Sequence, residues 1–360
     1  MKNIFFLLLC GLACCMMSCR STKNPDEIYS ENAPNVVMIV SQYYYKVILP
    51  NGNTMFFSGF DEDGDPENLS SDMDDLGTAR TVITGTGFFI SQDGKILTNR
   101  HVVKPEMKDK NVKSFFSSVK DVLSLFYQYK IAECKAEIDS LSEEMADCLY
   151  IDGDGDICYR IGYRDRFERL DKEQDEIIEL RKEAQEELSN VEDLNMEDIQ
   201  VEPICEYGIA YNDTHVTKSS DLIDCVLLNE SENEKVDLAT LQIKNHQTPE
   251  TVQIAKFYEA EDDEGINMGD ELYMIGYNAG FAVSNTAQGI KSQIYPGTLT
   301  QSDDGYRIMY SISALPGSSG SPVFDKYGYV VAVNFAGITA SQNFNYGIPA
   351  KRVREYLDKE

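Results

Sequence analysis

Three residues of the types used in nucleophilic catalysis stand in separate motifs of this sequence. His101 lies in TNRHVV directly after the apolar run KILT, and is a candidate catalytic base. Asp237 stands at the start of the apolar run LATLQI, where an acid is largely desolvated and needs a partner such as an imidazolium. Ser319 lies in GSSGSP, whose glycines permit a tight turn with converging backbone N–H groups. Such a turn builds an oxyanion hole.

The segments around these motifs predict mainly β structure. Short runs rich in Val, Ile, Tyr and Phe, separated by Gly, Asn and Asp clusters, occupy residues 33–103 and again about 201–336. Between them, apolar residues recur at three- and four-residue steps, which predicts two long amphipathic helices at 108–148 and 165–194. We therefore expect antiparallel strands interrupted by a helical insertion at 104–200.

In their order along the chain, the three motifs resemble those of trypsin-like serine proteases, and specifically the HtrA/Deg branch. The resemblance implies two antiparallel six-stranded β-barrels within a peptidase domain at 33–360, and we expect no PDZ domain after them. It is carried by the segments GTGFFISQDGKILTNRHVV (85–103), VDLATLQI (236–243), INMGDELYMIGYNAG (266–280), ALPGSSGSPVFDKYGYVVAVNFAG (314–337) and NYGIPAKRVREYL (345–357).

The resemblance also implies a role for each candidate residue. Ser319 Oγ would attack the scissile carbonyl, and His101 would take its proton and then protonate the leaving amine. Asp237 would hold the tautomer of the imidazole and stabilise its cation. The N–H groups of Gly317 and Ser319 would bind the oxyanion. No metal or organic cofactor is needed for this chemistry.

Departures from the family pattern bear on specificity. Ser321 replaces the usual second glycine of the nucleophile turn, a variant that glutamyl endopeptidases share. Those enzymes carry a histidine in the strand that walls the substrate pocket, whereas this chain has Asn334 there, followed by Phe335 and Ala336. Ser313 stands where trypsin-like enzymes place an acid at the base of the pocket. A neutral pocket for a small or aliphatic side chain is therefore expected, lined by Ser313, Asn334, Phe335 and Ala336.

The N-terminus has the pattern of a targeting segment. Lys2 precedes an apolar stretch at 4–17, which is too short for a comfortable transmembrane helix. The stretch ends in Met-Met-Ser-Cys, which resembles a bacterial lipobox and predicts lipidation of Cys19; Cys14 is a weaker rival site, and an ordinary cleaved signal peptide is the alternative. The polar segment 20–32 predicts a tether, so we expect a lipid-anchored protein of the bacterial cell envelope.

Composition excludes several other functions. The 32 basic and 61 acidic residues give a net charge of −29, which would repel a nucleic-acid backbone. After the first twenty residues no apolar run reaches the about 18–20 residues of a membrane-spanning helix. Five cysteines follow the targeting segment without CxxC spacing, so no metal site is expected, and only Cys148 and Cys158 are placed to pair across a turn.

The insertion at 104–200 is strongly acidic, and it begins three residues after His101. Residues 121–200 contain 24 acidic and 9 basic residues, a net charge of −15. We expect the insertion to gate the cleft or to recruit basic polypeptides, with a passive solvated arm as the alternative. The prediction for the whole chain is an envelope-anchored serine endopeptidase acting on polypeptides; a protease-like binding or chaperone module with a latent site is the alternative, and a homo-oligomer remains open.

Overall fold

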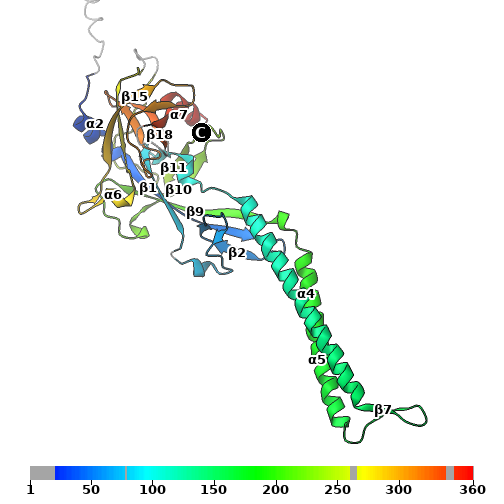
Figure 1. Ribbon diagram of the computed structural model, residues 1–360. Coiled ribbons are helices and arrows are strands. Elements are labelled where there is room, and N and C mark those ends of the chain that lie inside the picture. Colours follow the sequence, from blue (N-terminus) through cyan, green and yellow to red (C-terminus); the bar gives the residue numbers. More distant parts are fainter. Residues whose placement is uncertain (1–20, 78, 260–265, 338–343, 360) are drawn as a thin grey trace, which may run out of the picture. The chain divides into compact units, whose positions relative to one another are not determined.

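The computed structural model describes residues 21–77, 79–259, 266–337 and 344–359 and divides the chain into two compact units (Figure 1). The first unit consists of residues 1–43, 80–106 and 204–360, and contains the three candidate catalytic residues. The second unit consists of residues 44–79 and 107–203. Each unit is described by itself below.

The first six-stranded ring confirms one of the two expected barrels. Its five consecutive strand pairs, from β1–β5 to β10–β9, are antiparallel. An additional pairing of β1 with β9 closes the ring. Alternate residues of its strands fill an apolar interior that includes Phe89, Ile96 and Leu241, all fully buried. The strands follow the order β1 (Val36–Ile48), β5 (Thr81–Phe89), β6 (Lys95–Thr98), β11 (Ala239–Ile243), β10 (Ile223–Glu230) and β9 (Gln200–Tyr211).

The second barrel is likewise antiparallel and closed, so the expected fold class is confirmed. Its core contains the fully buried Leu272, Met274 and Val323. The strands follow the order β12 (Glu271–Gly276), β15 (Gln293–Gln301), β16 (Ile308–Tyr310), β19 (Asn345–Pro349), β18 (Val330–Gly337) and β17 (Pro322–Asp325). The same unit also contains η2 (Ala33–Asn35), α3 (Arg100–Val103), η5 (Ser219–Asp221), α6 (Phe281–Ser284), β13 (Asn285–Thr286), β14 (Gly289–Ile290) and α7 (Ala350–Leu357).

Part of the expected tether is folded. Helix α2 (Pro25–Asn32) begins after Asn24, whose side chain accepts from the N–H of Glu27 while the Glu27 carboxylate accepts from the N–H of Asn24. Ile28 is fully buried in the same apolar core as residues of the second barrel. The capping box and this single buried residue explain why a segment of polar composition is helical.

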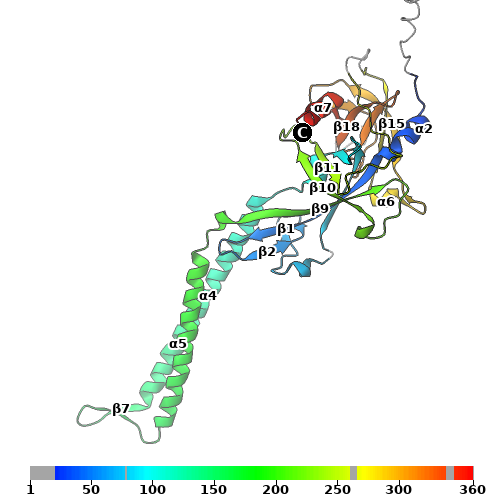
Figure 2. The same cartoon turned by 180° about the vertical axis from the view of Figure 1, so that it is seen from behind.

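The second unit is dominated by a helical hairpin, in agreement with the helices expected at 108–148 and 165–194 (Figures 1 and 2). Lys120 Nζ donates to the carbonyl oxygen of Glu192, the last residue of α5, and to that of Leu194 just beyond it. It thereby satisfies acceptors that a helix end leaves without intrahelical donors. The elements of this unit are β2 (Thr54–Phe57), β3 (Gly59–Phe60), β4 (Pro66–Glu67), η3 (Met73–Leu76), α4 (Asp109–Asp147), β7 (Leu149–Ile151), β8 (Ile157–Tyr159), α5 (Arg164–Glu192) and η4 (Met196–Asp198).

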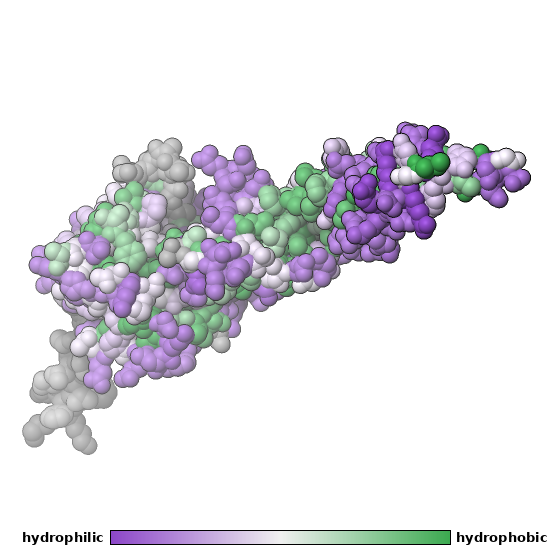
Figure 3. Space-filling view, turned by 90° about the horizontal axis from the view of Figure 1, so that it is seen from below, coloured by the Kyte–Doolittle hydropathy of each residue, from purple (hydrophilic) through white to green (hydrophobic). Residues whose placement is uncertain are grey.

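The apolar stripe of α4 that predicts the helix is largely exposed. Phe126 and Tyr129 expose 56% and 69% of their surfaces, whereas α4 buries Phe116, Cys134 and Leu141 instead. Apolar residues are visible on part of the hairpin in Figure 3, and most of its remaining surface is hydrophilic. Among the described helices, none combines the length and the apolar character that a bilayer crossing requires.

The strand pair β7 and β8 confirms the turn expected between the two helices. Asp152 Oδ1 accepts from the N–H groups of Asp154 and Asp156, which closes the turn. Cys148 and Cys158, which flank it, are both free thiols. The disulfide that the sequence left open is therefore not formed in this structure.

Candidate active site

The structure brings His101 and Asp237 into direct contact. His101 belongs to the short helix α3, which begins two residues after β6 ends. Its Nδ1 lies 2.5 Å from Asp237 Oδ2, and its backbone N–H donates to Asp237 Oδ1 at 3.0 Å. Asn99 Nδ2 donates to the carbonyl oxygen of Asp237 at 2.8 Å, which fixes the residue's backbone as well. One carboxylate thus orients the imidazole, and Nε2 is the ring nitrogen left for chemistry.

The two partners differ in their exposure to solvent. The His101 side chain is 48% exposed, so its ring is accessible from solvent. The Asp237 side chain is 19% exposed and stands between the buried residues Val236 and Leu238. An acid in this position is anchored by its apolar neighbours, and its two oxygens accept the hydrogen bonds that compensate for its partial desolvation.

The turn that contains Ser319 packs against the first barrel. Gly320 has φ +87°, and a Cβ on it would lie 2.1 Å from the carbonyl oxygen of Thr86 and 3.2 Å from the N–H nitrogen of Asn99. Since α3 begins immediately after Asn99, the nucleophile turn adjoins the base of the helix that carries His101. Ser319 is partly exposed, and its hydroxyl forms no hydrogen bond with the described residues.

Thr86 of β5 fixes two carbonyl groups of the nucleophile turn. Its Oγ1 donates to the carbonyl oxygen of Gly317 at 2.8 Å, and its backbone N–H donates to the carbonyl oxygen of Ser319 at 2.8 Å. Thr86 Oγ1 also accepts from the N–H of Tyr277 at 3.0 Å, so this buried hydroxyl both donates and accepts. A residue of the first barrel therefore holds both sides of Ser318.

The peptide between Pro316 and Gly317 is held by a residue of the second barrel's side of the chain, Ala279. The carbonyl oxygen of Pro316 accepts from the N–H of Ala279 at 2.7 Å. Gly317 has φ +101°, and a Cβ there would lie 2.3 Å from the carbonyl oxygen of Tyr277, so only glycine fits. Because the peptide is trans, the N–H of Gly317 points away from the bonded carbonyl.

The peptide between Ser318 and Ser319 follows the same rule. The carbonyl oxygen of Ser318 accepts from Asn334 Nδ2 at 3.1 Å, so the N–H of Ser319 points the other way. Within the described chain, neither the N–H of Gly317 nor that of Ser319 donates a hydrogen bond. The N–H groups of Ser318 and Gly320, in contrast, are both bonded within the protein. The turn thus keeps two backbone N–H groups that donate to no described residue.

The four residues expected to line the substrate pocket differ in their exposure to solvent. Ser313 is exposed, and Phe335 is partly buried with its ring 6.5 Å from that of Tyr346. Asn334 is 2% exposed and its side chain is bonded inside the barrel, which corrects the prediction that it walls an open pocket. The side chain of Ala336 lies outside the described residues.

Nothing in the sequence singled out Thr86 or Tyr310, which the structure connects to the nucleophile turn. Both are buried polar residues within apolar strands, and only their hydrogen-bond partners mark them. Burial raises the pKa of Tyr310 well above its usual value, so its hydroxyl stays protonated. The described residues contain no group of three or more His, Cys, Asp or Glu side chains placed to hold a metal ion.

Comparisons with known proteins found one matching family model and a similar solved structure. Residues 197–333 match the family model for the trypsin-like peptidase domain, a range that includes Asp237 and Ser319 and begins after His101. This stretch resembles a trypsin-like peptidase domain. Among solved structures it is similar to the serine endoprotease from Yersinia pestis, with 11% identity, a TM-score of 0.44, and coverage of 94% of this chain and 67% of the other. No curated protein matches this sequence.

Proposed function

We propose that this protein is a serine endopeptidase that cleaves polypeptides with Ser319 as nucleophile. The observation that carries the proposal is a pair of backbone N–H groups, on Gly317 and Ser319, that donate to no described residue. They lie beside the Ser319 hydroxyl, which also has no hydrogen-bond partner in the part of the chain that the structure describes. A structural turn would use these donors internally, because unpaired backbone groups are costly. Their availability is what an acyl-transfer site needs.

The reaction follows from the roles of three side chains. Ser319 Oγ attacks the scissile carbonyl carbon as His101 Nε2 takes its proton, and the tetrahedral intermediate forms. The imidazolium is stabilised by Asp237, which already accepts from the Nδ1 side of the ring at 2.5 Å. His101 then protonates the leaving amine, and water repeats the sequence to release the acyl group. In similar sites, one oxyanion donor contributes about 3–4 kcal/mol to transition-state stabilisation.

Envelope anchoring is part of the same proposal. Cys19 and the apolar stretch before it lie outside the described residues, so the support for a lipid anchor is the lipobox-like sequence. A lipid-anchored peptidase would meet polypeptides at a membrane surface. We propose a neutral substrate pocket, since Ser313 brings no charge to the position expected at its base.

A serine-directed fluorophosphonate tests the proposed nucleophile. The purified full chain should be labelled, whereas Ser319→Ala should show neither labelling nor hydrolysis of fluorescent casein above background. Ser318→Ala is the matched control for the chemistry of the label, because labelling at Ser318 would be lost in that variant alone. Equal labelling of the wild type and Ser319→Ala would refute the assignment, and a folded but unlabelled wild type would favour a binding module with a latent site.

A further inference from the structure

We infer that Asn334 and Tyr310 are positioning residues that aim the N–H of Ser319 at the oxyanion. This role rests on the proposed peptidase function, because it concerns the same site. Neither side chain reaches the substrate: Asn334 is 2% exposed and Tyr310 is fully buried within the second barrel. They act through the peptide group between Ser318 and Ser319.

Asn334 is bonded to the nucleophile turn on both sides of Ser319. Its Nδ2 donates to the carbonyl oxygen of Ser318 at 3.1 Å and lies 3.2 Å from Ser318 Oγ. Its main chain accepts from the N–H of Gly320 at 2.8 Å and donates to the carbonyl oxygen of Ser321 at 2.9 Å. One residue of β18 therefore fixes the turn before and after the nucleophile.

The orientation of the Asn334 amide follows from its partners. The carbonyl oxygen of Ser318 only accepts hydrogen bonds, so Nδ2 must face it and Oδ1 must face the opposite side. There the hydroxyl of Tyr310 lies 2.8 Å from Oδ1 and 3.1 Å from the carbonyl oxygen of Tyr346. When the Tyr310 hydroxyl donates to Oδ1, the shorter of these two contacts, it favours the amide orientation in which Nδ2 faces the Ser318 carbonyl.

Space for Tyr310 is provided by a glycine. A Cβ on Gly347 would lie 3.0 Å from Cε1 and 3.1 Å from the hydroxyl oxygen of Tyr310, closer than ordinary contacts. The barrel thus has room for the bulky side chain of Tyr310. An apolar residue at this position would need no hydrogen-bond partner, whereas the buried hydroxyl of Tyr310 does. A buried hydrogen-bond network of this kind favours one arrangement of the turn over others.

The first test separates binding from transition-state stabilisation. In Asn334→Leu, which has similar volume and no donor, kcat should fall 10- to 100-fold while KM changes less than twofold, since the N–H of Ser319 serves mainly the tetrahedral oxyanion. Tyr310→Phe should lower kcat less, by about 3- to 10-fold, because the amide keeps its donor. Turnover of a peptide p-nitroanilide ending in alanine, or of fluorescent casein if that peptide is not cleaved, is normalised to the fluorophosphonate-reactive fraction.

The second test is the pH profile of Asn334→Asp. Only a protonated carboxyl can donate to the Ser318 carbonyl, and burial raises the pKa of a carboxyl group. The activity of this variant relative to the wild type should therefore fall as pH rises through that pKa. Asn334→Leu should show the same relative loss at every pH. A purely structural role predicts no such difference between the two variants.

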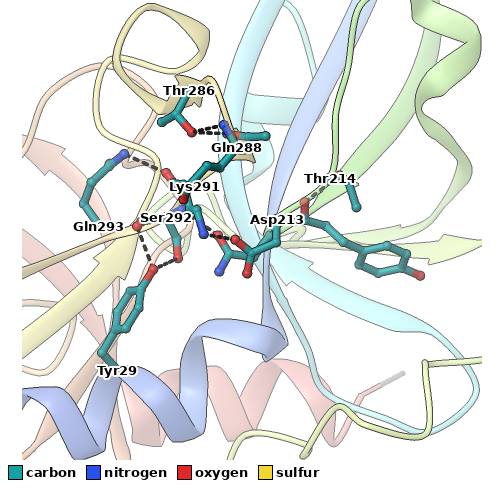
Figure 4. A network of polar contacts seen from close by, with 11 residues as sticks. Tyr29, Asp213, Thr214, Thr286, Gln288, Lys291, Ser292 and Gln293 are labelled. Atoms are coloured by element: carbon teal, nitrogen blue, oxygen red, sulfur yellow. Dashed lines mark hydrogen bonds and ion pairs between the residues drawn. The ribbon is translucent and has the colours of Figure 1, made fainter.

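Tyr29→Phe is the control for loss of a tyrosine hydroxyl (Figure 4). Tyr29 donates to the carbonyl oxygen of Ser292 at 2.9 Å and belongs to a different polar network. Its kcat should match that of the wild type. If kcat and KM of Tyr310→Phe and Asn334→Leu match those of the control, the positioning role is wrong although the peptidase stands. If the wild type itself neither hydrolyses nor labels, the proposed function fails instead.

Discussion

The hydroxyl of Ser321 occupies the space that a side chain at Gly276 would need. A Cβ on Gly276 would lie 2.0 Å from Ser321 Oγ and 3.1 Å from Thr86 Oγ1. Ser321 is fully buried, and it is the residue that departs from the second glycine usual in such turns. The serine is accommodated because strand β12 ends in a glycine where the two elements meet.

This relationship predicts that Gly276→Ala destabilises the fold by about 1–3 kcal/mol, the usual cost of overpacking a buried site. Ser321→Gly in the same chain should restore most of that loss, because it removes the clashing hydroxymethyl group. Chemical denaturation of the single and double variants measures both effects. Gly153→Ala is the control, since no atom lies within 4 Å of its added Cβ. Strictly additive effects of the two substitutions would contradict the shared space.

Asp237→Asn should reduce kcat by about 10⁴-fold with little change in KM. The amide can no longer stabilise the imidazolium, and it favours the wrong tautomer of His101, whose Nδ1 now contacts the carboxylate at 2.5 Å. Hydrolysis of fluorescent casein, corrected for folded protein by circular dichroism, gives the comparison. Activity within tenfold of the wild type would mean that Asp237 does not serve as the orienting acid.

The motifs and their periodicity predict much of this fold, because strand runs and helix repeats depend on local patterns. The helices expected at 108–148 and 165–194 begin and end within two residues of α4 and α5. The Asn334 side chain lies inside the barrel and not in the expected pocket wall, and the difference has a physical reason. The register of β18 against β19 shifts between Asn334 and Ala336, and such a bulge changes which side chains face inward. The run VAVNFAG carries no alternation that would reveal it.

Long-range contacts explain the other differences. Thr86 and Gly317 are 231 residues apart in the chain, so nothing local indicates that one fixes the carbonyl of the other. The exposed apolar stripe of α4 shows the same limit, since periodicity identifies a helix and its apolar face without identifying the partner of that face.

Cys19→Ala should release the protein from the membrane. The prediction depends on the Ser-Cys ending of the apolar stretch, and a diacylated cysteine gives stable anchoring where a single chain does not. Detergent-phase partitioning of the wild type and the variant, both expressed in a bacterium, provides the measurement. Cys14→Ala is the matched control and should stay in the detergent phase. A wild type found in the aqueous phase would exclude the anchor.

The last prediction concerns the helical insertion, which we expect to select protein substrates. It combines a net charge of −15 over residues 121–200 with exposed apolar residues on α4, features suited to basic and unfolded polypeptides. Replacing residues 106–198 with a short Gly/Ser linker should reduce cleavage of an unfolded basic protein relative to a small peptide. It should also weaken the salt dependence of that cleavage, because fewer charges act on the substrate.

A surface variant distinguishes recruitment by α4 from a general effect of the deletion. Val122→Ser together with Phe126→Ser removes exposed apolar area without changing charge, since these residues are 65% and 56% exposed. If the apolar face contributes, this variant should cleave unfolded protein more slowly while peptide cleavage and its salt dependence stay unchanged. If the acidic charge acts alone, the variant should match the wild type and only the deletion should lower selectivity. Identical rates on every substrate in the deletion and the wild type would make the insertion a passive arm.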